Sequence, residues 1–585
     1  MKWSIIFLVF TFQLGAQSFD ARNVDENEDP DEEHYLNEIL ESIFQPFDLK
    51  NADSSQLDSR GFSQVAISAI LKWQGESGTK HAIKTLQKGL SEQDINLLDR
   101  LTWKGNHGKV LTLRQSLHSS ASLNGWRILQ KARVGSRWGE LMYLIEQDPG
   151  EARLSDHSIL TFASNLIPGF TQVILGDFHV RWGAGIILNQ PGFRANLNPG
   201  SLLVKSQLAI TPHYSSRETD YFRGVAAKWA LSGVNGAIFL SNREVVGVQS
   251  EAGFKEDSDG IHPAGKQFQT SSERMAGVAG NYDIGSFRCF GAIILNSQIS
   301  LTSQCEFGVT WQVNDSQVVQ VFTGLTGIQG GRSVLVWSYS SNPVILSIQY
   351  RKYRSRIPMS SGAVFTMLGT DAINESGIVA RLQIKPAQKV LFRYALDTGF
   401  SAKLNSLTRR NRIVQHKTQV ILRQVKREWQ LDVSLKHSGP VTPNDIWHDQ
   451  VSYARITKIA LSLDQVIGSN FQYRLNLKTA KSPSNKSLLI QQRLLINTFP
   501  LKASIGFVRF IVPDFALRLS IYESGLLESF SFFTAYQDGQ RWFLYLKRRF
   551  REQVDLELRL AHSHLDQEQM TAKQLDVSFQ LSVVL

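Results

Sequence analysis

The chain of 585 residues has only two cysteines, and beyond its N-terminal segment it has no run of 18 apolar residues. A transmembrane helix needs about 20 mostly apolar residues, so a protein that spans a membrane with helices is excluded. Charged residues at 20% and hydrophobic residues at 42% exclude a disordered chain. The chain is also too long for one compact soluble core, which stops growing near about 250–300 residues.

The first 41 residues combine an export signal with an acidic segment. Lys2, an apolar stretch over 3–12 and small residues ending at Ala16 predict a signal peptide over 1–16, followed by an acidic flexible segment over 17–34. Residues 20–41 hold ten acids and one arginine, a net charge of −9. Since the whole chain carries +11 and Lys2 contributes one charge, the remainder carries +19, which favours anionic partners.

The end of the chain shows the pattern that recurs through most of it. Leu575, Val577, Phe579, Leu581 and Val583 alternate with polar residues. A period of two indicates a β-strand, because successive side chains leave opposite faces of the backbone. About ten residues is also the length with which a tilted strand crosses a bilayer.

Similar alternation over 108–585 predicts a mainly β fold, a large antiparallel transmembrane β-barrel of about 20–26 strands. A soluble, half-exposed sheet is the alternative. Full charges on the polar faces favour the barrel, because they suit a watery lumen. The alternation is interrupted in four segments, 190–220, 251–274, 354–376 and 437–450, which are expected to form long outer loops. Asp538-Gly539 is expected to form a hairpin turn.

A weak repeat precedes the barrel, over residues 35–105. Gly61-Phe62-Ser63 recurs 28 residues later as Gly89-Leu90-Ser91, each time followed by helical spacing of apolar residues. This arrangement resembles the small, all-α tandem helix-hairpin-helix domain of DNA-uptake and DNA-repair proteins. The resemblance implies that the backbone amides of the two turns hold a phosphate.

Three lysines support a DNA-binding interpretation of this domain. Lys80, Lys84 and Lys88 share one face of an expected helix that leads into the second turn. The alternative is a solvated helix face on a domain that contacts a periplasmic protein or plugs the barrel. Both readings stay open on the sequence alone.

Three stretches, 146–151, 176–186 and 218–226, resemble outer-membrane barrel proteins of Bacteroidota-type bacteria that carry an N-terminal helix-hairpin-helix domain. The resemblance implies an outer-membrane location, with the N-terminal domain in the periplasm or in the lumen. Glycines in these stretches are expected at bulges or close backbone contacts. Charged residues there are expected to form an ionic network, because a lone buried charge is costly. The positions with a structural or gating role are Asp177, Arg181, Gly183, Gly185, Glu218, Arg223 and Gly224.

The two cysteines, Cys289 and Cys305, are symmetric about Ser297, inside an expected turn at 296–298. A hairpin centred there places them opposite each other, and an exported protein could oxidise them to a disulfide. Two free, buried side chains are the alternative.

The sequence contains no recognised catalytic or cofactor motif, neither a phosphate loop nor a HExxH, GxSxG or CxxC pattern. His562 and His564 share one strand face, but no carboxylate or cysteine near them completes a metal site. We therefore expect no cofactor, no metal and no enzymatic activity, although a Ser–His pair of a barrel-embedded hydrolase would leave no motif. The expected function is a channel, transporter or export component for an anionic substrate, with outer-membrane lipid around it. DNA uptake through the N-terminal domain is the alternative.

Overall fold

The computed structural model describes residues 109–584 and, before them, residues 69, 70 and 73, which are helical. Within 109–584 the description omits 121–124, 137–138, 148–156, 189–201, 204–207, 214–220, 232, 251–252, 257–268, 298–301, 327–329, 355–374, 388, 403–409, 425, 442–453, 469, 499, 524–530, 551–553 and 567–570. The predicted signal peptide, the acidic segment and all the named residues of the helix-hairpin-helix domain lie outside the described residues.

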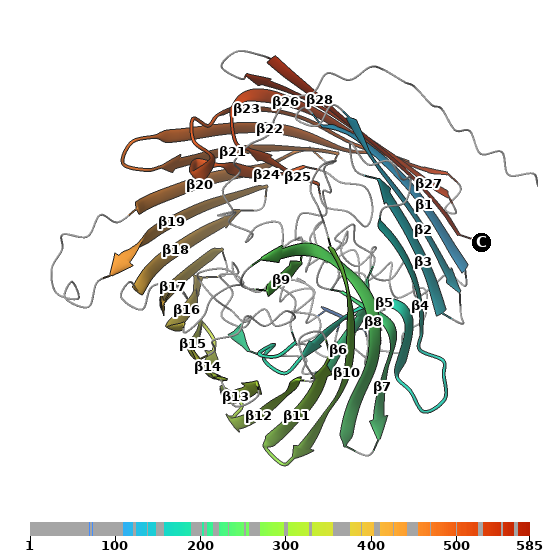
Figure 1. Cartoon of the computed structure of the whole chain (residues 1–585). Helices are drawn as coiled ribbons and strands as arrows, with labels where there is room; N and C mark the ends of the chain where they lie inside the picture. The colour runs from blue at the N-terminus through green and yellow to red at the C-terminus, as the bar shows by residue number, and fades with distance from the viewer. Residues whose placement is uncertain are drawn as a thin grey trace, which may run out of the picture.

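The described chain is almost entirely β-structure (Figure 1). Its strands are β1 Lys109–Ser120, β2 Gly125–Ser136, β3 Gly139–Gln147, β4 His157–Ser164, β5 Gln172–Trp182, β6 Leu208–Pro212, β7 Phe222–Leu231, β8 Val234–Ser250, β9 Gly253–Glu256, β10 Gln269–Ile284, β11 Phe287–Asn296, β12 Thr302–Asn314, β13 Gln317–Thr326, β14 Gly330–Ser341, β15 Val344–Arg354, β16 Ser376–Ala387, β17 Val390–Ala402, β18 Arg410–Gln424, β19 Arg427–Val441, β20 Ala454–Ile467, β21 Phe471–Lys481, β22 Lys486–Thr498, β23 Leu501–Ile511, β24 Leu519–Glu523, β25 Ser531–Ala535, β26 Asp538–Phe550, β27 Val554–Asp566 and β28 Thr571–Val584. A 3₁₀ turn, η2, covers Phe515–Leu517. None of the described helical residues belongs to a helix long and apolar enough to cross a membrane.

The wall is a closed ring of antiparallel strands. The main sheet has 26 strands, of which β6 and β9 pair only with β5 and β8 respectively, so 24 strands form the wall. The ring closes because β1 pairs with β28 over Val110–His118, with Leu113 opposite Leu581. The prediction of a barrel with 20–26 strands is confirmed.

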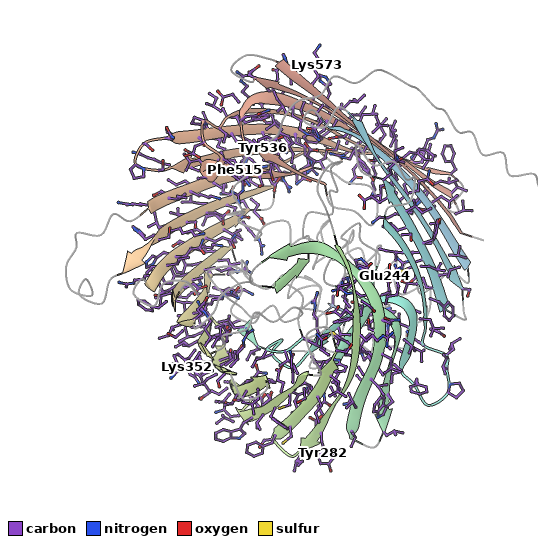
Figure 2. The ribbon with its side chains drawn as sticks, viewed as in Figure 1. Glu244, Tyr282, Lys352, Phe515, Tyr536 and Lys573 are labelled. Atoms are coloured by element: carbon purple, nitrogen blue, oxygen red, sulfur yellow. The ribbon has the colours of Figure 1, made fainter. Side chains whose placement is uncertain are left out.

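The two faces of the wall separate the side chains as the alternation predicted. On β28, Leu575 and Phe579 are 39% and 41% exposed on the outside, while Ser578 and Ser582 are buried on the inside. Tyr282 projects outward at the edge of the ring (Figure 2). An apolar exterior around a polar interior is the arrangement of a membrane-spanning barrel.

The connections differ between the two ends of the barrel. The two-residue turns between wall strands, such as 285–286 and 342–343, lie at one end, where β1 begins and β28 ends. The four segments expected as loops all join strands at the opposite end. They are shorter than expected, however, because part of each is strand: β6, β9, and the ends of β10, β15 and β19.

The predictions of two turns are wrong. Asp538 and Gly539 begin β26, and the Asp538 carboxylate accepts the backbone N–H of Val512 at 2.6 Å. The turn between β11 and β12 is not centred on Ser297, because Asn296 pairs with Thr302. Cys289 therefore lies opposite Val309 and Cys305 opposite Ile293, four residues away from the expected register. Both cysteines are free, and the expected disulfide is not formed.

Candidate functional site: the inner face of the barrel

β5 leaves the wall half-way along its length. Its first part, up to Phe178, pairs with β7, and its second part, Phe178–Trp182, pairs with β6 instead. A strand that exchanges its partner in this way carries the following residues away from the ring. The segment 178–188, here called the inner segment, and β6 therefore lie inside the barrel (Figure 1).

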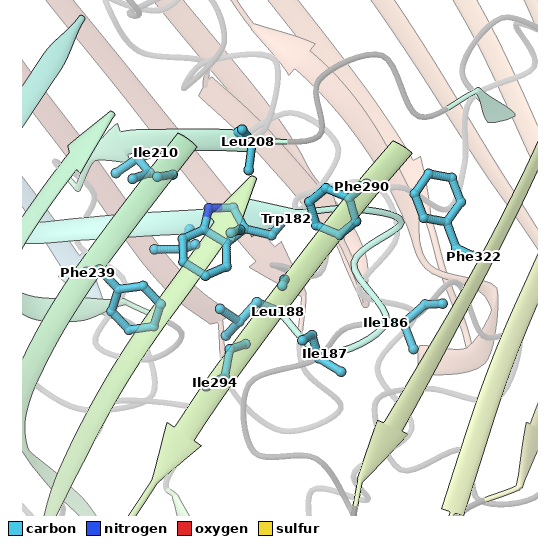
Figure 3. Packing of buried hydrophobic residues seen from close by; sticks show 14 of the residues in the cluster. Trp182, Ile186, Ile187, Leu188, Leu208, Ile210, Phe239, Phe290, Ile294 and Phe322 are labelled. Atoms are coloured by element: carbon cyan, nitrogen blue, oxygen red, sulfur yellow. The ribbon is translucent and has the colours of Figure 1, made fainter. Parts of the chain in front are cut away.

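The inner segment is held by apolar contacts with the wall (Figure 3). Trp182 is fully buried, and its ring centroid lies 5.2 Å from that of Phe239 on β8. Ile186, Ile187 and Leu188 are also fully buried, in one cluster with Phe290 and Phe322 of β11 and β13. Since each such side chain contributes about 1.5–3 kcal/mol when buried, the segment is firmly docked.

One carboxylate of the wall fixes the turn of the inner segment. Glu306 of β12 accepts the backbone N–H of Ala184 at 2.7 Å through Oε1, and those of Ile186 and Ile187 at 3.2 and 3.3 Å through Oε2. Gly183 makes this approach possible: its φ is +58°, and a Cβ there would lie 2.1 Å from Oε1 of Glu306. Glu306 was not singled out by the sequence, although it is an acid at an inward position of a regular strand.

The ionic network expected in the stretches 176–186 and 218–226 forms only in part among the described residues. Asp177 is buried and accepts Nε of Arg223 at 2.6 Å and Nη2 at 3.2 Å. Arg181 lies on the second half of β5, in the lumen, and Glu218 lies outside the described residues. Gly185 has a φ of +73°, and Gly224 packs so closely that a Cβ would lie 2.1 Å from the carbonyl oxygen of Leu240.

A second segment lies inside the wall, between β23 and β26. η2 and the hairpin of β24 and β25 cover apolar side chains of the wall such as Val508 and Phe510. Glu523, at the end of β24, accepts Nε of Arg541 at 2.6 Å and Nη2 of Arg559 at 2.5 Å. Arg541 also donates to Asp576 of β28 at 2.7 Å, so this ionic cluster ties the hairpin to three wall strands.

Charged side chains also form buried clusters elsewhere on the inner face. Arg351 of β15 is fully buried and contacts Glu375 at 2.6 Å and Asp397 of β17 at 3.0 Å. The sequence predicted charges facing a watery lumen. At this cluster the charges are instead enclosed by neighbouring side chains, and Arg351 forms ion pairs with both carboxylates.

One arc of the inner face, β16–β22, has an excess of positive charge. In the regularly paired inward rows from that of Arg474 to that of Asp397, nine cationic residues stand against four carboxylates. Lys478 shows that these side chains point into the barrel, because its Nζ donates a hydrogen bond to the carbonyl oxygen of Ser520 on the inner hairpin. The cations are Arg381, Arg393, Lys417, Arg423, Lys436, Lys458, Arg474, Lys478 and Arg493, and the acids are Asp397, Glu428, Asp432 and Asp464.

The remaining candidates from the sequence do not form a site. His562 and His564 lie on the outer face of β27, where burial alternates with that of inward Ser563. The described residues contain no group of three or more potential metal ligands. Gly61, Phe62, Ser63, Lys80, Lys84, Lys88, Gly89, Leu90 and Ser91 lie outside the described residues, so phosphate binding stays a prediction.

Comparison with known proteins adds little to the fold itself. No sequence family and no curated protein matches the chain. Among solved structures, the chain is similar to the P pilus usher PapC translocation pore. The two are 9% identical, the match covers 81% of this chain and 98% of the PapC chain, and the TM-score is 0.37. It is also similar to the copper transporter OprC (9% identity, 81% and 80% covered, TM-score 0.40) and the FrpB iron transporter from Neisseria meningitidis (6% identity, 83% of each chain, TM-score 0.42).

Proposed function

We propose that this protein is an outer-membrane barrel that carries an anionic substrate, as a channel, a transporter or an export component. The observation that supports this most strongly is the cationic arc on β16–β22. A surface of one sign inside low-dielectric walls attracts the opposite charge and raises its local concentration. The apolar exterior supports the location in a membrane.

The two inner segments support a regulated passage rather than a wide, open pore. Each is anchored to the wall by a carboxylate, Glu306 for the inner segment and Glu523 for the β24–β25 hairpin. Each also lies between consecutive wall strands, so it can rearrange without opening the ring. The N-terminal domain would act from the periplasm or from within the lumen.

Ion selectivity of the full-length protein in planar bilayers tests the proposal. Under a salt gradient we expect anion selectivity, which Lys458→Glu shifts toward cations because the substitution reverses one charge of the arc. Lys573→Glu is the matched control, because Lys573 is an exposed lysine on the outer face of β28. Cation selectivity in the wild type, or no conductance even after residues 17–105 are deleted, would contradict the proposal.

A further inference from the structure

The outer face of the wall has a groove of about 560 Å³ that crosses four neighbouring strands, β7, β8, β10 and β11. Its side chains come from two adjacent rows of outward positions. The register places Val225, Leu240, Ala276 and Leu295 in one row. The second row, one step closer to the end with long connections, holds Arg223, Asn242, Arg274 and Ser297.

The first row belongs to the apolar belt of the barrel. Leu240 is 54% and Leu295 44% exposed, and the next row toward the tight turns is also apolar, with Ile238, Val278 and Ile293. Ala276 is the small member of its row, directly between the two leucines. The missing side-chain volume opens a gap of the kind that an acyl chain can fill.

The second row is polar and cationic. Arg274 is exposed, and its guanidinium has no partner within the described strands. Arg223 uses Nε and Nη2 for Asp177 and the carbonyl oxygen of Ser158, while its Nη1 donates to no described residue. The two arginines are two strands apart, about 10 Å between Cα atoms, which long side chains can bridge around one anion.

Apolar and cationic rows meet here at the level where a membrane-spanning wall passes from hydrocarbon to head groups. Glu244 is one row further out and forms no ion pair within the described strands, so it does not neutralise Arg274. We propose that this groove binds an anionic lipid of that leaflet, with its phosphate between Arg223 and Arg274 and an acyl chain over Ala276. This site is on the outside of the wall and is independent of what passes through the lumen.

The test is lipid binding to the full-length protein, purified and delipidated in detergent, by native mass spectrometry. The probe is bisphosphorylated lipid A, and dephosphorylated lipid A and inorganic phosphate are the comparison ligands. We expect one lipid A to bind, Arg274→Gln to weaken binding about 10-fold as one charge-assisted contact is lost, and Ala276→Phe to weaken it by filling the gap. Arg223 is left intact, because its loss would also expose buried Asp177.

Arg288→Gln is the matched control, since Arg288 is an exposed arginine at the tight-turn end of β11 and should leave binding unchanged. Equal binding of the dephosphorylated lipid would contradict the role of the arginines. Displacement of the lipid by millimolar inorganic phosphate, or wild-type affinity in both Arg274→Gln and Ala276→Phe, would overturn the proposal of a lipid site.

Discussion

The carboxylate of Glu306 on β12 accepts the backbone N–H of Ala184, 122 residues earlier in the chain, at 2.7 Å. This contact joins the inner segment to β12 of the wall, and the same carboxylate also accepts hydrogen bonds from the backbone N–H groups of Ile186 and Ile187. A carboxylate more than a hundred residues later in the chain thus fixes the turn of a segment that apolar contacts hold against the wall.

Glu306→Gln should loosen the inner segment. An amide has one acceptor oxygen instead of two, so at least one buried N–H loses its partner, at a cost of about 1–3 kcal/mol. We expect trypsin to cleave the folded variant after Arg181 faster than the wild type. The control is Asp283→Asn, which removes an exposed ion pair with Arg288 and should not change this cleavage. Equal cleavage of Glu306→Gln and wild type would show that the carboxylate does not hold the segment.

Glu523→Gln should destabilise the whole barrel. The substitution leaves the buried guanidinium groups of Arg541 and Arg559 without their shared anion, which costs about 3–5 kcal/mol. The measurement is the temperature at which the folded protein loses its fast migration on an SDS gel. Glu428→Gln removes an exposed pair with Arg423 and should cost about 0–1 kcal/mol. The same temperature for both variants would contradict the anchoring role of Glu523.

The cysteines test the register of β11 and β12. We expect two free thiols in the unreduced, denatured protein, since Cys289 and Cys305 are not opposite each other. Val309→Cys, combined with Cys305→Ser, should form a disulfide with Cys289 on mild oxidation. A disulfide between the two native cysteines would instead restore the hairpin centred on Ser297.

DNA binding by the N-terminal domain is tested on the full chain by a gel shift. If the domain binds DNA, retardation weakens with salt, because each phosphate contact releases counterions. Replacing Lys80, Lys84 and Lys88 together with glutamine should then abolish it. Retardation that the triple variant retains would assign the binding to the basic barrel and not to these lysines.

The sequence was sufficient for the wall because alternation is a local property. The spacing of Leu575 and Phe579 alone predicts that they share one apolar face, and both are exposed on the outside. The register between strands was less accessible. A slip of four residues, as between Cys289 and Cys305, keeps every side chain on its face, so alternation cannot detect it.

The inner segments could not be predicted for a different reason. Gly183 and Gly185 were recognised as positions of unusual backbone, but nothing near them in the sequence indicates Glu306 as their partner. Likewise, Glu523 follows a stretch, 515–521, that alternates like a wall strand although it forms η2 and β24 of the inner hairpin, and its partners Arg541 and Arg559 come from later strands. Contacts across a lumen depend on how the ring closes, and only the structure provides that.

Closure of the ring between β1 and β28 is therefore the claim to test first. In a background with Cys289→Ser and Cys305→Ser, Leu113→Cys with Leu581→Cys places two thiols opposite each other on the outer face. We expect a disulfide in the protein inserted in bilayers, and none with Leu113→Cys and Gln580→Cys, because Gln580 points inward. No disulfide in the first pair, or equal yields in both, would contradict a closed barrel.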